Sequence, residues 1–217
     1  MWGEKMYIYK ILVIDDEVQI KDTCIIYKRY LKSKFNLEVE FDVINSEADY
    51  NDNVPYDVLL VDYDLKKGFS LNDKLMGDEF IKKFREKNKI SKVIFYSSAF
   101  KYRPDEPNYD FPFEDKEAFD LINNLQIDRI ADKNNFEMML EVIKSCCERV
   151  DILPVLLSKM VEEYEKEEIK VSYTNIQGQE VLLSDLLVDI INDNEQGKVF
   201  RKNIIDTVLS VILNFKY

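Results

Sequence analysis

The fold is decided by the stretch YDVLLVDYDL at residues 56–65. Its apolar run from Val58 to Val61 ends abruptly in Asp62, Tyr63 and Asp64. This pattern is typical of a fully buried strand of a parallel sheet that carries carboxylates at its end. Because functional sites in such sheets lie at the carboxyl ends of the strands, Asp62 is the first candidate for a functional residue.

A second strand, further upstream, ends in the same way. The run KILVI at residues 10–14 leads directly into Asp15, Asp16 and Glu17. If the two strands are parallel neighbours, their carboxyl ends bring Asp15, Asp16 and Asp62 into one shallow pocket. Carboxylates at that range repel one another unless a cation neutralises them, and Mg2+ is a hard cation that prefers oxygen ligands. The sequence therefore predicts a magnesium site at this edge of the sheet.

Strand and helix patterns alternate along the first 150 residues. Besides the two strands above, apolar runs predict strands at residues 37–43, 92–96 and 127–131. Apolar spacings of three and four predict helices at residues 18–35, 78–87, 114–125 and 136–150, the last capped by Asn134 or Asn135, and Ser46 can cap a short helix at 47–51. Five alternations of this kind predict an α/β domain over residues 1–150, built on a doubly wound, five-stranded parallel sheet.

Residues 151–217 have a different pattern, which predicts a small and mostly helical region. Asp151 and Pro154 open a helix that runs to about Lys166. Residues 170–183 then have the pattern of a β-hairpin. We expect this region to act as an output or dimerisation module.

The end of the chain is predicted to contain two further helices. We expect the hairpin to turn at Gln177 and Gly178, Ser184 to cap the first of these helices, and Gly197 to break it. The last helix covers residues 198–215, and its apolar stripe is wide enough to predict burial on two sides. Such a stripe is more often plain core than a dimer seam, and both interpretations stay open at this point.

Composition narrows the classes of function. The chain has 217 residues, is 46% hydrophobic and 33% charged, and carries a formal net charge of −12. A net negative charge of this size argues against nucleic-acid binding as the main function, because the phosphate backbone would repel the protein. No apolar run reaches the length of a membrane span, and the first ten residues lack the features of a signal peptide, so we expect a cytoplasmic protein that does not contact membranes.

Cysteine and histidine usage excludes several kinds of site. The chain has three cysteines, Cys24, Cys146 and Cys147, without CxxC spacing, and it has no histidine. A disulfide framework or a zinc site is therefore not expected, and the thiols are predicted to pack in helices. The lack of histidine also excludes Ser/His and Cys/His catalysis, as well as histidine phosphotransfer by this chain itself.

Polar residues follow four of the predicted strands in a characteristic order: Asp15 and Asp16, then Asp62, then Ser97, then Lys133. On these residues, positions 6–150 resemble the receiver domain of two-component response regulators, which has a flavodoxin-like fold. The resemblance implies that a histidine kinase or phosphotransfer protein donates a phosphoryl group to Asp62. It also implies a Mg2+ ion held by Asp15, Asp16, Asp62 and the backbone carbonyl of Asp64, and a movement of Ser97 that transmits the signal.

The same residues have a consistent chemical interpretation. A carboxylate that attacks phosphorus needs its own charge and that of the phosphoryl group neutralised, which a metal ion held by Asp15, Asp16 and Asp62 can supply. Lys133 would hold the phosphoryl oxygens, and the hydroxyl of Ser97 would donate a hydrogen bond. Asp62 would be the nucleophile that forms an aspartyl phosphate, so we expect no enzymatic activity beyond phosphorylation and dephosphorylation of the chain itself.

Several positions depart from the receiver pattern. The family usually has an aromatic residue three positions before the lysine and a proline after it, whereas this chain has Ile130 and Asn134. The loops at residues 66–76 and 101–112 are also longer than usual. These departures leave the acidic pocket intact, but they indicate that output runs through the loops or through the C-terminal module.

Three alternatives to a phosphorylated switch remain open, together with one alternative form of its output. Asp15 and Asp16 could simply cap the first helix. Lys198, Arg201 and Lys202 form a small basic cluster that would suit a DNA-binding transcriptional response regulator. A pseudo-receiver would bind partners without phosphorylation. Finally, the DxD pattern that begins at Asp62 resembles that of haloacid dehalogenase-like phosphatases, although these place it on their first strand.

Overall fold

A computed structural model of the chain describes residues 7–50, 56–65, 76–101, 113–175 and 178–214. The predicted loops at 66–76 and 101–112 lie almost entirely outside these residues, as do Gln177 and Phe215. Two compact units are distinguished by their contacts. The first comprises residues 1–86 and 91–150, and the second comprises residues 87–90 and 151–217.

The first unit is built on a five-stranded parallel sheet. Its strands are β1 (Ile8–Ile14), β2 (Glu38–Ile44), β3 (Val58–Asp62), β4 (Lys92–Ser97) and β5 (Arg129–Asp132). They lie in the order β2-β1-β3-β4-β5, and every neighbouring pair is parallel. This is the flavodoxin-like order, in which β1 and β3 flank the point where the chain reverses direction across the sheet. The predicted doubly wound sheet is therefore confirmed.

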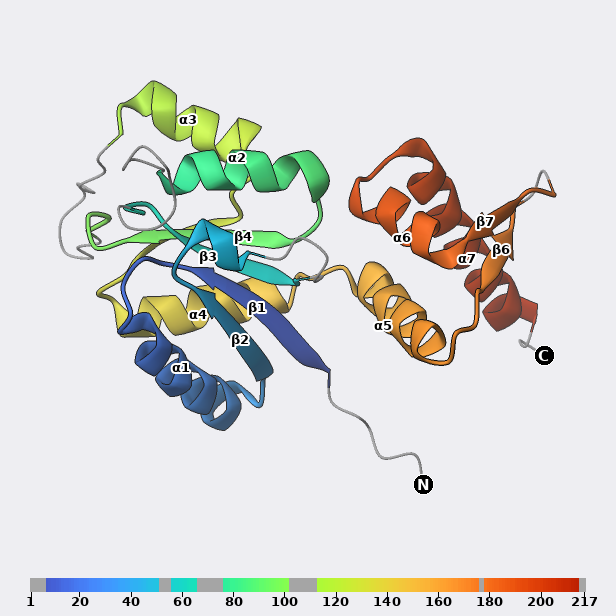
Figure 1. Ribbon diagram of the computed structural model, residues 1–217, viewed down its shortest axis with the longest axis horizontal. Coiled ribbons are helices and arrows are strands. Elements are labelled where there is room, and N and C mark those ends of the chain that lie inside the picture. Colours follow the sequence, from blue (N-terminus) through green and yellow to red (C-terminus); the bar gives the residue numbers. More distant parts are fainter. Residues whose placement is uncertain (1–6, 51–55, 66–75, 102–112, 176–177, 215–217) are drawn as a thin grey trace. The chain divides into compact units, whose positions relative to one another are not determined.

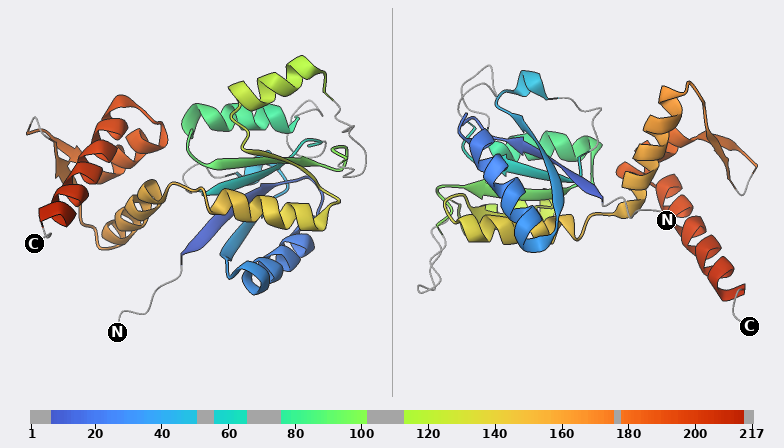
Figure 2. Two further views of the ribbon diagram at one scale, coloured as in Figure 1. Left: turned by 180° about the vertical axis from the view of Figure 1, so that it is seen from behind. Right: turned by 90° about the horizontal axis from the view of Figure 1, so that it is seen from below.

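Helices cover both faces of this sheet (Figures 1 and 2). They are α1 (Ile20–Phe35), α2 (Gly77–Lys87), α3 (Asp115–Asn124) and α4 (Phe136–Cys147), and a short 3-10 turn, η1 (Glu47–Asp49), follows β2. One apolar cluster joins α1 and α4 to one face of the sheet, and a second joins α2 and α3 to the other. All five residues of β3 are buried, because both faces of this central strand are covered.

Local signals explain several of the boundaries in the first unit. The side chain of Asn135, rather than that of Asn134, caps α4 by accepting a hydrogen bond from the backbone N–H of Met138 at 3.0 Å. The hydroxyl of Ser46 lies 2.8 Å from the carboxylate of Asp49 in η1. All three cysteines are buried and free, in α1 and α4, as predicted.

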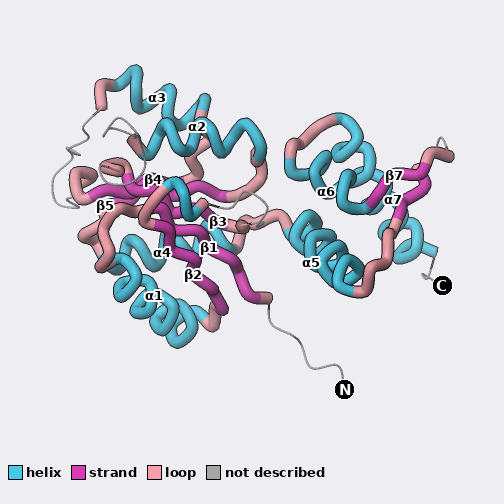
Figure 3. Tube along the Cα trace, in the orientation of Figure 1, coloured by secondary structure: helices cyan, strands magenta, loops and turns pink. Residues whose placement is uncertain are grey.

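In its described residues, the second unit consists of helices and a β-hairpin (Figure 3). The helices are α5 (Ile152–Lys166), α6 (Leu183–Ile191) and α7 (Glu195–Asn214), and the antiparallel hairpin consists of β6 (Ser172–Thr174) and β7 (Glu180–Leu182). Asp151 caps α5 by accepting a hydrogen bond from the N–H of Leu153 at 3.1 Å. A small core of apolar side chains joins α5, α6 and the first part of α7. No helix in the described part of the chain is long and apolar enough to cross a membrane.

Two details of the predicted C-terminal region are wrong. Ser184 lies inside α6, which begins one residue earlier, so it does not cap the helix. Gly197 lies in the first turns of α7 and does not break α6. A Cβ atom on Gly197 would lie 2.5 Å from the backbone oxygen of Asp189, so this glycine allows α6 and α7 to approach closely.

The predicted burial of the last helix on two sides is also wrong. Phe200 is buried in the small core of the second unit. From Ile204 onward, the large apolar side chains of α7 are between 37% and 60% exposed. The apolar pattern correctly predicted a helix with an apolar face, but it did not indicate that the side chains of this face would be exposed.

Candidate functional site

The carboxyl ends of β1 and β3 bring three aspartates together. Asp15 and Asp16 follow β1, and Asp62 is the last residue of β3, which pairs with β1. One carboxylate oxygen from each of the three lies within 4.8 Å of the others. Asp15 is fully buried and Asp62 is 4% exposed, while Asp16 is half-buried. This pocket has the position expected for the functional site of a flavodoxin-like sheet.

Lys133 reaches into the pocket from the end of β5. Its Nζ lies 2.7 Å from Oδ2 of Asp62, 2.9 Å from Oδ2 of Asp15 and 3.1 Å from Oε2 of Glu17. Its backbone N–H donates a hydrogen bond to the carbonyl of Ser97 at 3.0 Å, which ties the start of the loop after β5 to the end of β4. From the sequence, Glu17 was only the residue that follows the two aspartates. The ion pair between Glu17 and Lys133 is seen only in the structure.

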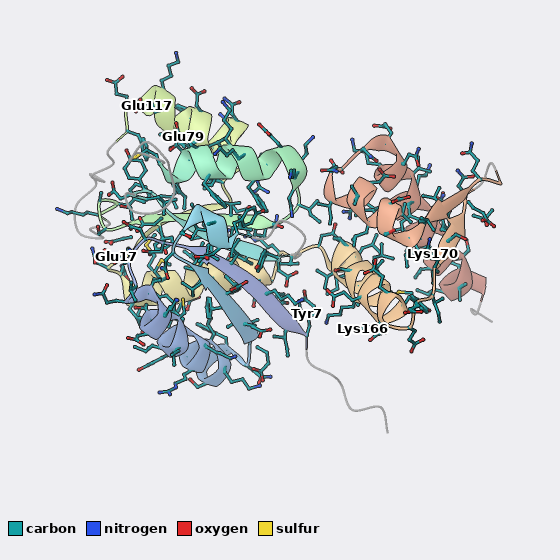
Figure 4. All side chains as sticks on the ribbon, in the orientation of Figure 1. Tyr7, Glu17, Glu79, Glu117, Lys166 and Lys170 are labelled. Atoms are coloured by element: carbon teal, nitrogen blue, oxygen red, sulfur yellow. The ribbon has the colours of Figure 1, made fainter. Side chains whose placement is uncertain are left out.

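Glu17 lies at the edge of the pocket, where β1 ends (Figure 4). Its side chain is 59% exposed, so it faces solvent while contacting Lys133. The pocket thus holds the carboxylates of Asp15, Asp16, Glu17 and Asp62 against a single ammonium group. This leaves an excess of negative charge, which favours binding of a cation.

Burial has opposite effects on the protonation of the two central groups. It raises the pKa of Asp62 to about 6, and this effect outweighs the hydrogen bond and charge of Lys133, which lower it. Desolvation lowers the pKa of Lys133, but the hydrogen bonds and negative charges of Asp62 and Asp15 together raise it above its ordinary value. Lys133 is therefore a permanent cation of the pocket, whereas Asp62 can exchange a proton near neutral pH.

The raised pKa of Asp62 makes the stability of the metal-free protein depend on pH. Between the ordinary pKa of 3.8 and the folded-state value of about 6, the folded chain holds a proton that the unfolded chain has lost. The free energy of unfolding should therefore fall as the pH rises through this window, by up to ~3 kcal/mol.

Urea denaturation in the presence of a chelator, at several pH values across this window, measures the effect. Other carboxylates add their own pH dependence, so the relevant quantity is the difference from Asp62→Asn, which cannot titrate at this position. A difference between the two proteins that is independent of pH would contradict the raised pKa.

Ser97 and Asp64 lie beside the pocket in different roles. Ser97 is fully buried at the end of β4, and its hydroxyl accepts a hydrogen bond from the backbone N–H of Ala99 at 3.1 Å. Among the described residues, no hydrogen bond joins Ser97 to Asp62. The backbone N–H of Asp64 donates to Oδ1 of Asp62 at 3.3 Å, so the chain turns around the carboxylate and keeps the backbone of Asp64 next to it.

Tyr96 is a part of the site that sequence reasoning missed, because it was interpreted only as the last apolar residue of a strand. Its hydroxyl donates a hydrogen bond to Oδ2 of Asp15 at 2.6 Å, and its ring centroid lies 5.5 Å from Nζ of Lys133. Burial and the charges of Asp15 and Asp62 raise the pKa of Tyr96 well above its ordinary value, so it remains a donor. Tyr96 therefore fixes Asp15 and flanks Lys133. The sequence feature that could have indicated this role is the position of the tyrosine directly before Ser97.

The donor set fits Mg2+. Three carboxylates from two adjacent strand ends offer oxygen ligands within 4.8 Å of one another, and oxygen is the donor that this ion prefers. Asp15 is held in place by Tyr96 and by the backbone N–H of Glu17, which donates to its Oδ1 at 2.9 Å. Such supporting hydrogen bonds orient ligands around a metal ion.

The positions that depart from the receiver pattern are placed as follows. Ile130 is half-buried in β5 and packs against the apolar cluster on the α2 and α3 side of the sheet. The backbone N–H of Asn134 donates to the carboxylate of Asp132 at 2.9 Å. Position 130, where the receiver pattern has an aromatic residue, thus holds a packed aliphatic side chain.

Comparisons with known proteins give similarity at the level of structure. No protein-family model matches the chain, and no curated protein matches it. A CheY-like response regulator receiver domain protein from Methanospirillum hungatei is 19% identical, with a TM-score of 0.46, covering 65% of this chain and 95% of that chain. Chemotaxis protein CheY4 from Vibrio cholerae is 16% identical, with a TM-score of 0.44, covering 64% and 99%.

A third solved structure, a two component transcriptional regulator AraC from Clostridium phytofermentans, is 19% identical, with a TM-score of 0.44, covering 65% of this chain and 93% of that chain. The flavodoxin-like strand order that the sequence resemblance implied is present in the sheet itself, and each of the three solved structures covers about two thirds of the chain. The remaining third is unassigned.

Proposed function

We propose that this chain is a signalling switch of the response-regulator type, in which Asp62 accepts a phosphoryl group from a histidine kinase or a phosphotransfer protein. The observation that supports this proposal is the geometry around Asp62. Its carboxylate lies with those of Asp15 and Asp16 at one sheet edge, and the ammonium of Lys133 lies 2.7 Å from its Oδ2. These are the groups that an acyl phosphate needs around it: ligands for a cation, and a fixed positive charge.

The phosphorylation step follows from these positions. An oxygen of ionised Asp62 attacks the phosphorus of phosphohistidine, the P–N bond breaks, and its electron pair stays on the imidazole of the donor, which then takes up a proton. Lys133 exchanges its contact with Asp62 for the phosphoryl oxygens, and the hydroxyl of Ser97 turns from Ala99 toward the phosphate. Asp15, Asp16, Asp62 and the carbonyl of Asp64 would hold Mg2+, which would supply positive charge to neutralise the phosphoryl group. Hydrolysis of the acyl phosphate resets the switch.

Output through protein contacts of residues 151–217 is part of this proposal. The basic cluster at the start of α7 is not well suited to binding nucleic acid, because two of its cations already have acidic partners. This favours a protein partner for the module. Arg201 pairs with Asp151, and Lys198 lies 3.5 Å from the carboxylate of Glu195. A surface that is to bind phosphates needs cations that are free of such partners.

Intact-protein mass after incubation with Mg2+ and acetyl phosphate tests the proposed function. We expect the native chain to gain one phosphoryl group and Asp62→Asn to gain none. Asp64→Asn is a matched control, because only the backbone of Asp64 has a role in the proposal, so this variant should still be modified. A native chain that is folded but gains no phosphoryl group and binds no Mg2+ would contradict the proposal and leave a pseudo-receiver that binds partners without phosphorylation.

A further inference from the structure

The second half of α7 exposes an unusually apolar surface. We define the apolar face of α7 as Ile204, Ile205, Val208, Leu209, Val211 and Ile212, whose side chains are between 37% and 58% exposed. At 100° per residue these six positions cover an arc of roughly 160°. An amphipathic helix that packs on one side of a core needs an apolar stripe of about 100°. The face is therefore wider than a single neighbouring helix covers.

The charge of this helix segment argues against a membrane surface as its partner. Between residues 203 and 213 the only charged side chain is Asp206, although the whole chain has a net charge of −12. Helices that lie on membrane surfaces carry Lys or Arg on their polar side, and this segment has none. A second copy of the chain, in contrast, can bring the same uncharged face into contact without placing like charges opposite each other.

The second unit exposes another apolar stripe, on α5. Ile152, Leu156 and Met160 follow one another at a spacing of four residues and are 50%, 50% and 42% exposed. Four-residue spacing places these side chains along one side of the helix. Together the two stripes can supply roughly 300–500 Å² of apolar area, taking about half of a fully buried aliphatic side chain for each residue. A standard interface of about 800 Å² per partner is a little over half apolar, so this area is sufficient.

We propose that the apolar face of α7 docks a second copy of this chain in a two-fold symmetric contact. Each α7 packs against its counterpart, and the α5 stripe of each copy covers the part of the partner's face that one helix leaves exposed. The contact is independent of phosphorylation, so it stands or falls separately from the proposed function. We expect a dissociation constant in the micromolar range, which is the weak end of the range found for interfaces of standard size.

Sedimentation velocity of the full chain, over about a hundredfold range of concentration around the expected constant, tests this proposal. The double variant Val208→Lys/Ile212→Lys places two charges at the centre of the face and should weaken association by at least about a hundredfold. The matched control Thr207→Lys/Ser210→Lys adds the same charges to the polar side of the helix and should leave association within a few-fold of the native chain. Leu156→Lys, on α5, should weaken association by a smaller factor than the double variant.

Circular dichroism and thermal unfolding show whether each variant keeps its fold, which is expected because all the replaced side chains are exposed. A native chain that stays monomeric at every concentration would overturn the proposal, whether or not it binds vesicles of anionic lipid. A dimer that survives Val208→Lys/Ile212→Lys would also overturn it, because the contact would then lie elsewhere on the molecule.

Discussion

Replacing Gly77 with alanine is expected to destabilise the chain by about 3 kcal/mol or more, although alanine is the better helix former. Gly77 is the first residue of α2, and its N–H donates to the carbonyl of Tyr63 at 3.0 Å. A Cβ atom at this position would lie 2.0 Å from the backbone oxygen of Asp62 and 2.9 Å from the ring of Phe95. Since the closest atom belongs to the backbone, no side-chain rotation can relieve the clash, and α2 must move away from the end of β3.

Urea denaturation of Gly77→Ala and the native chain measures this effect, with Gly178→Ala as the matched control. Gly178 has a φ of +77°, and among the described residues a Cβ atom at this position would contact nothing within 4 Å. Its substitution should therefore lower the free energy of unfolding only by the cost of holding alanine in a left-handed conformation, about 1 kcal/mol. Because the displaced backbone belongs to Asp62, Gly77→Ala should also weaken Mg2+ binding. A stabilising effect at Gly77 would mean that helix propensity outweighs packing here, which would contradict the close approach of α2 to β3.

Lys133→Met is expected to lower the free energy of unfolding of the metal-free protein by about 3–5 kcal/mol at neutral pH. Lys133 is the counter-ion of Asp62 and Asp15, and those two side chains are almost fully buried. Methionine fills a similar volume but leaves the carboxylates without a positive charge, and an uncompensated buried charge is costly. The loss should be partly recovered by Mg2+, because the ion would then supply the missing charge.

The recovery by Mg2+ is what separates this explanation from a simple loss of packing. Denaturation curves with a chelator and with Mg2+ should differ more for Lys133→Met than for the native chain. Lys34→Met is a suitable control, since Lys34 lies 2.6 Å from Glu137 in a solvent-exposed ion pair, which contributes little to stability. An equal response of Lys133→Met and the native chain to Mg2+ would show that the lysine is not a counter-ion of the carboxylates that we propose as metal ligands.

Much of the first unit could be predicted from the sequence, because its elements follow from local patterns. The buried run before Asp62 and the one before Asp15 predicted two central strands, and β3 and β1 pair side by side. In a parallel sheet all strands end at the same edge, so residues that follow the strands must gather there. This rule predicted one pocket for Asp15, Asp16 and Asp62, and the resemblance to receiver domains added Ser97 and Lys133.

The contacts within that edge were decided only by the tertiary structure. Whether Lys133 contacts Asp62 or Asp15 depends on how far its side chain reaches across two strands, and the structure shows that it contacts both. The hydrogen bond from Tyr96 to Asp15 joins residues that lie 81 positions apart in the chain, so no local pattern could indicate it. The close approach that Gly77 permits likewise depends on where α2 lies relative to β3.

The last helix shows most clearly the difference between what the sequence predicts and what the tertiary structure decides. Its apolar spacing correctly predicted a helix with an apolar face, because side-chain period follows directly from backbone geometry. The burial of that face depends on which surfaces are near it after folding, and in this chain its residues from Ile204 onward stay exposed. Sequence periodicity thus determined which side chains form the apolar face of the helix, whereas only the three-dimensional arrangement decided which of them are buried.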